Sequence, residues 1–174
     1  MREINTKKLA TLSLLISVAM ILSYIESLIP PLVAVPGVKL GLSNIATVFA
    51  LYTLGAQSAV TVSILRVFLS ALLFGNFVSL TYSFSGAVLA LALMILIHKI
   101  GRFSSVGVSV VGGVAHNAGQ IIAACIVMES AAIALYLPTL VISGTVAGIA
   151  IGIASGILVK KTEKYIKKQF SAVP

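Results

Sequence analysis

Residues 78–97 read VSLTYSFSGAVLALALMILI and contain no charged side chain. Residues 98–105 follow as HKIGRFSS, and residues 106–128 resume an apolar run, VGVSVVGGVAHNAGQIIAACIVM. About 20 consecutive apolar residues are enough for an α-helix to cross the roughly 30 Å hydrocarbon core of a bilayer. These segments therefore predict two membrane-spanning helices joined by a short basic loop.

The whole composition agrees with this interpretation. Of the 174 residues, 59% are hydrophobic and only 9% are charged. A soluble domain carries about 25% charged residues, so this chain could not cover a globule with a water-compatible surface. We expect an all-α integral membrane protein, with residues 1–174 forming a single membrane domain. Six transmembrane helices are predicted, at about 9–29, 40–54, 57–74, 78–97, 106–128 and 132–159, followed by a basic tail at 160–174.

The positive charges predict an orientation. Ten of the twelve basic residues lie at the N-terminus, in the loop 98–105 or in the tail after residue 159. Cytoplasmic loops of membrane proteins carry an excess of Lys and Arg, so both termini are expected on the cytoplasmic side of the plasma membrane. The net charge of +8 is then explained by contact with anionic membrane lipids, and no nucleic-acid partner is expected.

Arg66 is the charged residue that most needs an explanation, because it falls near the middle of the predicted helix 57–74. A charge at that depth costs roughly 2.5–3.5 kcal/mol on insertion scales. We expect Arg66 to face a wet cavity and an anionic ligand; the alternative is that it caps helix carbonyls inside the bundle. The chain has no Asp, and by this topology none of its four glutamates is expected at that depth: Glu3, Glu26, Glu129 and Glu163.

A second polar group lies in the predicted helix 106–128, within the stretch GGVAHNAGQII. His116, Asn117 and Gln120 share one broad helix face because residues three and four apart are neighbours on a helix. Flanking glycines leave space beside them. We predict that these residues form one wall of a binding pocket, whereas the alternative is a set of interhelical hydrogen bonds.

Further polar residues are expected toward the outer leaflet. Lys39 lies in the loop between the first two predicted helices, where it could guard the pocket entrance or simply pair with Glu26. The other candidate substrate-binding residues in this region are Asn44, Asn76 and Tyr82.

Small residues recur on two predicted helices. Gly144, Gly148, Gly152 and Gly156 form a stripe with a spacing of four residues. Such a stripe lets a neighbouring backbone approach closely, either within the bundle or on a partner subunit. A weaker stripe on the first helix consists of Ala10, Ser13 and Ser17.

Several chemistries lack a recognisable motif. The sequence has no Walker A pattern for ATP hydrolysis and no Asp-rich motif that would hold Mg²⁺. Cys125 is the single cysteine, so no disulfide can form within the chain and no metal cluster is expected. We therefore expect no cofactor, no metal and no enzymatic activity.

Three stretches resemble the Gx transporter family, whose members are often labelled heptaprenyl diphosphate synthase component I. The stretches are PGVKLGLSNIATVFALY (36–52), RVFLSALLFGNFVSLTYSFSGAVLALALM (66–94) and GVSVVGGVAHNAGQIIAA (107–124). The resemblance covers about residues 8–160, and the family resembles the S components of energy-coupling factor (ECF) transporters.

This resemblance implies a specific function. S components are six-helix proteins with an outward-open pocket for a vitamin-like molecule, and they work with a membrane coupling subunit and cytoplasmic ATPases. Small residues on the first helix dock the coupling subunit, which would assign that role to Ala10, Ser13 and Ser17. The expected function is uptake of a small anionic compound, vitamin-like or an isoprenoid or quinone precursor; the alternative is a membrane accessory subunit of a heptaprenyl or polyprenyl diphosphate synthase.

Overall fold

The computed structural model of the chain describes residues 6–29 and 41–170, with the side chains of the last helix described as far as Tyr165. This part of the chain contains no strand, so the predicted all-α class is confirmed. Five helical segments are long and apolar enough to cross a membrane, and one apolar helix is shorter. The elements are α1 (Thr6–Ser27), α2 (Asn44–Thr53), α3 (Ala56–Phe74), α4 (Phe77–Ile100), α5 (Ser105–Val127), η1 (Ala131–Tyr136) and α6 (Leu137–Phe170).

Local sequence explains where several helices begin and end. The Asn76 side chain accepts a hydrogen bond from the Ser79 N–H at 2.8 Å, which satisfies one free donor at the start of α4. The Ser104 hydroxyl accepts from the Gly107 N–H at the start of α5. Gly101 ends α4 with a φ of 73°, a left-handed conformation that glycine adopts without steric cost.

Two helices differ from the sequence-based boundaries. α2 begins at Asn44 rather than near residue 40, so it has only ten residues and a length of about 15 Å. α6 begins at Leu137, after the 3₁₀ turn η1, and continues to Phe170. Residues 157–170 contain neither glycine nor proline, so nothing in the sequence stops the helix at residue 159. Much of the expected tail is therefore an extension of α6.

The glycine stripe of α6 packs against α5. A Cβ atom placed on Gly148 would lie 2.6 Å from the Val110 Cα, and one placed on Gly144 would lie 2.9 Å from the Gly113 carbonyl oxygen. Only glycine lets the two backbones come so close. Of the two interpretations of this stripe, packing within the bundle is the one that the structure confirms.

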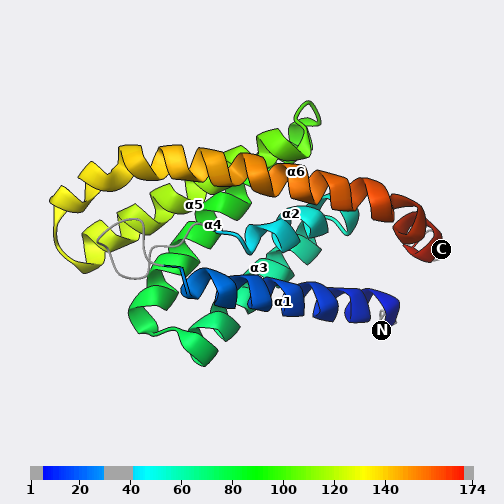
Figure 1. Ribbon diagram of the computed structural model, residues 1–174, viewed down its shortest axis with the longest axis horizontal. Helices are drawn as coiled ribbons and strands as arrows, with labels where there is room; N and C mark the ends of the chain where they lie inside the picture. The colour runs from blue at the N-terminus through cyan, green and yellow to red at the C-terminus, as the bar shows by residue number, and fades with distance from the viewer. Residues whose placement is uncertain (1–5, 30–40, 171–174) are drawn as a thin grey trace.

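The helices form a layered bundle in which α6 lies along α5 and α4 packs on the other side of α5 (Figure 1). α1 packs on α3 and α2, so the short α2 lies between α1 and α6. The first turn of α1 and the last turns of α6 lie at the same end of the molecule (Figure 1). Ala10, Ser13 and Ser17 are all exposed on the outer surface of α1.

The close approach of α5 and α6 predicts that replacing glycine by alanine in the α6 stripe lowers the stability of the fold. Alanine normally favours a helix over glycine by about 1 kcal/mol. We expect Gly148→Ala nevertheless to lower the free energy of unfolding by about 1–3 kcal/mol, because its Cβ would push the two backbones apart. Thermal unfolding in detergent, followed by circular dichroism, measures this change.

Gly107→Ala is the matched control, because a Cβ there would make its nearest contact at 3.4 Å, with the Phe103 ring. This variant should be neutral or slightly stabilising. Equal destabilisation by both substitutions would contradict the packing argument.

Candidate functional site

The short length of α2 brings its first residues level with Arg66. α2 and α3 are antiparallel and joined by a tight turn. Arg66 lies ten residues after Ala56, so it is about 15 Å along α3 from that turn, and the first residue of α2 is about 15 Å from the same turn. The Arg66 Nη1 donates a hydrogen bond to the Ser43 Oγ at 2.6 Å. Arg66 is only 3% exposed. The irregular backbone just before α2 therefore reaches into the bundle and meets the buried guanidinium.

Glu26 of α1 belongs to the same region. Its side chain is 4% exposed, its Oε1 accepts a hydrogen bond from the Gly41 N–H, and its charge attracts the Arg66 guanidinium. No glutamate is expected at the depth of Arg66, yet the charge of Glu26 still acts on its guanidinium. Counting from the helix ends separates these two residues by roughly 10 Å along the bundle axis. The segment 41–43 links the two residues, because Gly41 donates to Glu26 and Ser43 accepts from Arg66.

Part of the Arg66 guanidinium has unmet hydrogen-bonding capacity. Its Nε and Nη2 atoms are buried and have no hydrogen-bond partner among residues 6–29 and 41–165. The buried hydroxyls of Ser23 and Thr47 are in the same condition within those ranges. A buried donor left without a partner costs about 1–3 kcal/mol, and more for a charged group. An anion that accepted from Arg66 would recover this cost.

His116 and Gln120, two of the predicted site residues on α5, lie against glycines of neighbouring segments. A Cβ on Gly41 would lie 2.9 Å from the Asn44 Nδ2 and 3.6 Å from the His116 Cδ2. A Cβ on Gly86 of α4 would lie 2.9 Å both from the His116 Nδ1 and from the Gln120 Cγ. The absence of side chains at both glycines thus lets α5 approach the start of α2 and α4. We call the group Glu26, Ser43, Asn44, Arg66 and His116 the polar cluster.

Asn117 points in a different direction from His116. Its Nδ2 donates to the Leu140 carbonyl oxygen at 2.7 Å and to the Ser143 Oγ at 3.5 Å. These contacts tie α5 to α6, as the interpretation of interhelical hydrogen bonds predicts. Its Oδ1 is buried without a hydrogen-bond partner in the described part of the chain.

The remaining candidates lie apart from the polar cluster. Asn76 is exposed and caps α4. Tyr82 is buried in an apolar group with Ile121, Ala124 and Leu140. Lys39 falls outside the described residues, so its predicted role at the entrance stays a prediction.

A signal for Glu26 was present in the sequence. The buried residues of α1 are Ala19, Ser23 and Glu26, which recur with helical spacing and so share one face. Two polar residues on the buried face of a membrane helix indicate an inward-facing carboxylate. Ser43 carries no comparable signal, because its position depends on where α2 begins.

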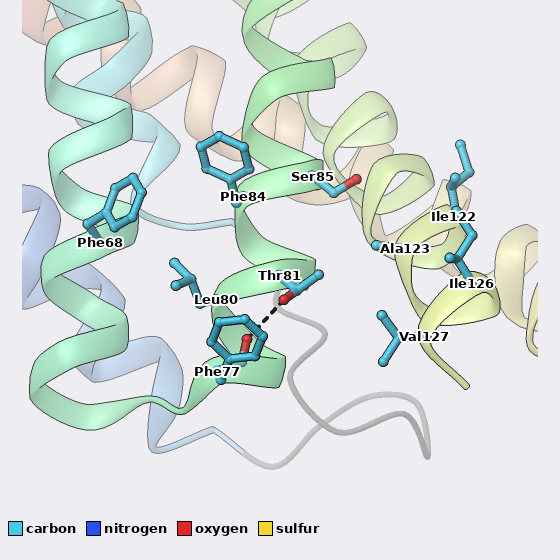
Figure 2. Close-up of a pocket in the computed structure, with 10 residues that line it drawn as sticks. All are labelled: Phe68, Phe77, Leu80, Thr81, Phe84, Ser85, Ile122, Ala123, Ile126 and Val127. Carbon is cyan, nitrogen blue, oxygen red and sulfur yellow. Dashed lines mark hydrogen bonds between the residues drawn. The ribbon is translucent and has the colours of Figure 1, made fainter. Parts of the chain in front are cut away.

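The pocket shown in Figure 2 is lined mainly by apolar side chains and contains no residue of the polar cluster. It has a volume of about 410 Å³ and lies among α3, α4 and α5, with Phe68, Phe77 and Phe84 around it. Its polar atoms are the hydroxyls of Thr81 and Ser85, which donate to the carbonyls of Phe77 and Gly119. With no charge in its lining, this pocket suits an apolar chain rather than an anionic group.

Comparison with known proteins gives one match. Residues 15–158 match the profile of a family described as heptaprenyl diphosphate synthase component I, which covers most of the chain. No curated protein and no solved structure matches the chain.

The charge of Glu26 acts on Arg66 and both residues bond to the segment 41–43, which predicts an energetic coupling between them. Glu26→Gln or Arg66→Gln alone leaves an uncompensated buried charge, so each should destabilise the fold strongly. The double variant removes both charges and should be less destabilised than the sum of the two, by about 0.5–3 kcal/mol. Unfolding free energies of the four proteins in detergent measure the coupling; strict additivity would show that the two side chains do not interact.

Proposed function

Since the chain belongs to the family described as heptaprenyl diphosphate synthase component I, we propose that it is a multi-pass membrane protein that binds a small anionic compound for uptake, in the manner of an ECF S component. The observation that carries this proposal is the buried guanidinium of Arg66, two of whose nitrogens have no partner in the described chain. An arginine retained at such depth points to a functional site.

The proposed recognition follows from the chemistry of the polar cluster. Arg66 supplies a planar pair of charged donors, which suits a carboxylate or phosphate group. Ser43 already holds Nη1, so the free Nε and Nη2 edge is the one that meets the ligand. Asn44 and His116 would orient its uncharged part, and Gln120 would extend this wall along α5. Lys39 would attract the anion at the entrance.

The energy for uptake would come from partner proteins. The sequence has no Walker A pattern, so ATP hydrolysis is assigned to separate ATPases and a membrane coupling subunit. The exposed face of α1 with Ala10, Ser13 and Ser17 supports docking there, because small residues let another helix approach closely.

The family description favours a second candidate. A protein described as a component of heptaprenyl diphosphate synthase would act as the membrane subunit of a prenyl-transferring enzyme. In that case the Asp-rich motifs for Mg²⁺ would belong to a soluble partner, because this chain contains no aspartate.

Binding at Arg66 predicts a retained ligand. Protein purified in mild detergent should carry a small anion that mass spectrometry of the extract identifies. The Glu26→Gln/Arg66→Gln double variant removes both buried charges and so keeps them balanced. It should retain at least about tenfold less of this anion, since a hydrogen bond to a charged group contributes about 1.5–3 kcal/mol.

Arg102→Gln is the control for this measurement, because it removes an exposed arginine in the loop between α4 and α5. It should retain the ligand fully. Equal retention by wild type and a folded double variant would refute the anion site.

Co-purification distinguishes the two candidate functions. A coupling subunit and ATPases that co-purify with the chain support transport, whereas a soluble prenyltransferase supports the synthase subunit. If α1 docks the coupling subunit, Ser13→Phe should abolish that association, while Leu72→Phe, exposed on α3, should leave it intact. Loss of association in both variants, or in neither, would remove α1 from the interface.

A further inference from the structure

A second pocket lies at the end of the bundle where α6 leaves its apolar stretch. It has a volume of about 460 Å³ and lies where α2, α5 and α6 meet. Its lining is divided by chemistry: Ile153, Ile157 and Val106 are apolar, whereas Ser104 and Lys160 are polar. None of these residues belongs to the polar cluster around Arg66.

The position of Lys160 places this pocket at a membrane boundary. Lys160 is the first charged residue of α6, and it lies 23 residues after Leu137, a rise of about 35 Å. The hydrocarbon core is roughly 30 Å thick, so α6 has crossed it when it reaches Lys160. Ile153 lies about 10 Å deeper along the same helix. The pocket thus extends from the headgroup level at Lys160 into the adjoining part of the hydrocarbon core at Ile153.

The surroundings of the pocket are strongly basic. Lys160 is followed by Lys161 and Lys164, against one acidic residue, Glu163. The loop between α4 and α5 adds Arg102, and Lys99 lies in the last turn of α4. Basic pockets between membrane helices bind the head groups of anionic lipids, with a gain of about 1 kcal/mol for each basic residue near the surface.

Contacts between helices hold this pocket in shape. The Tyr52 ring, at the end of α2, packs edge-on against His98 with ring centroids 4.5 Å apart, and its hydroxyl donates to the Phe103 carbonyl at 3.3 Å. The Ser105 hydroxyl donates to the Gly152 carbonyl oxygen at 3.1 Å. The Ser104 hydroxyl accepts from Gly107, which leaves its own proton free to donate outward.

We propose that this pocket binds an anionic phospholipid from the adjacent leaflet. The phosphate lies against the Lys160 ammonium and the Ser104 hydroxyl, and the start of an acyl chain lies along Ile153 and Ile157. A phospholipid satisfies both halves of the lining at once, whereas a soluble phosphate leaves the apolar half exposed to water. The bound lipid connects the end of α2 with α5 and α6.

Native mass spectrometry of the full chain in detergent tests this proposal, with phosphatidylglycerol and phosphatidylcholine of identical acyl chains added in equal amounts. Wild type should retain phosphatidylglycerol in preference. Lys160→Gln should lower the phosphatidylglycerol-bound fraction about fivefold, the change expected for one basic residue at a lipid surface. Lys160→Arg should restore binding. Circular dichroism confirms that each variant is folded.

Lys161→Gln is the matched control, because it removes the same charge from the adjacent residue, which does not line the pocket. It should bind clearly more phosphatidylglycerol than Lys160→Gln does, because Lys161 contributes only the general attraction of the basic surface and no contact inside the pocket. An equal loss in both Gln variants would indicate diffuse attraction by the basic surface and overturn the proposal. Equal binding of the two lipids by wild type, or complete competition by soluble glycerol phosphate, would also overturn it.

Discussion

The cost of holding the Arg66 charge inside the bundle constrains the arrangement of α1, α2 and α3. The guanidinium must find hydrogen-bond acceptors and an opposite charge where no bulk water is available. Ser43 supplies an acceptor only because α2 is too short to span the bundle, so that the backbone before it enters at the level of Arg66. Glu26 supplies the opposite charge and also binds the Gly41 N–H, which holds that same segment of backbone. The short α2 therefore lets Ser43 reach the buried Arg66, and the hydrogen bond to Arg66 in turn stabilises the non-helical backbone before α2.

Close packing on the other side of the bundle gives this polar cluster a firm support. The glycines of α6 let it approach α5 closely, and Gly86 lets α4 approach the His116 and Gln120 face of α5. Asn117 then fixes α5 to the first turn of α6 through the Leu140 carbonyl. α1 lacks such contacts along its outer surface, where both small and large side chains are exposed. The fold thus has a tightly packed part built around α5 and a more open face on α1.

Much of this could be predicted from sequence, and the differences have physical causes. Composition and apolar run lengths suffice for the all-α membrane class, because the thickness of a bilayer fixes the length of a spanning helix. The inward position of Arg66 and His116 follows from the cost of exposing them to lipid. The start of α2 is the part that the sequence predicts least well, because it depends on Gly41 adopting a φ of 86°, a left-handed conformation that glycine permits but that the sequence alone does not require. Asn117 contacts α6 rather than the polar cluster because α6 packs closely on α5, which the spacing of polar residues along α5 does not reveal. Glu26, by contrast, could be placed from the sequence on the face of α1 that carries Ala19 and Ser23.

α2 connects the two sites that the chain offers. Asn44, its first residue, and Ser43, the residue before it, belong to the polar cluster, and Tyr52 near its other end lines the basic pocket, as does Lys160. A ten-residue helix is too short to bend appreciably, so a shift at one end is carried to the other. A lipid that fixes Tyr52 against α5 and α6 therefore also restrains the position from which Ser43 meets Arg66. By the same reasoning, an anion at Arg66 that displaced Ser43 would be felt at the basic pocket. α5 joins the two sites as well, because it contributes His116 to the polar cluster and Ser105 and Val106 to the lining of the basic pocket.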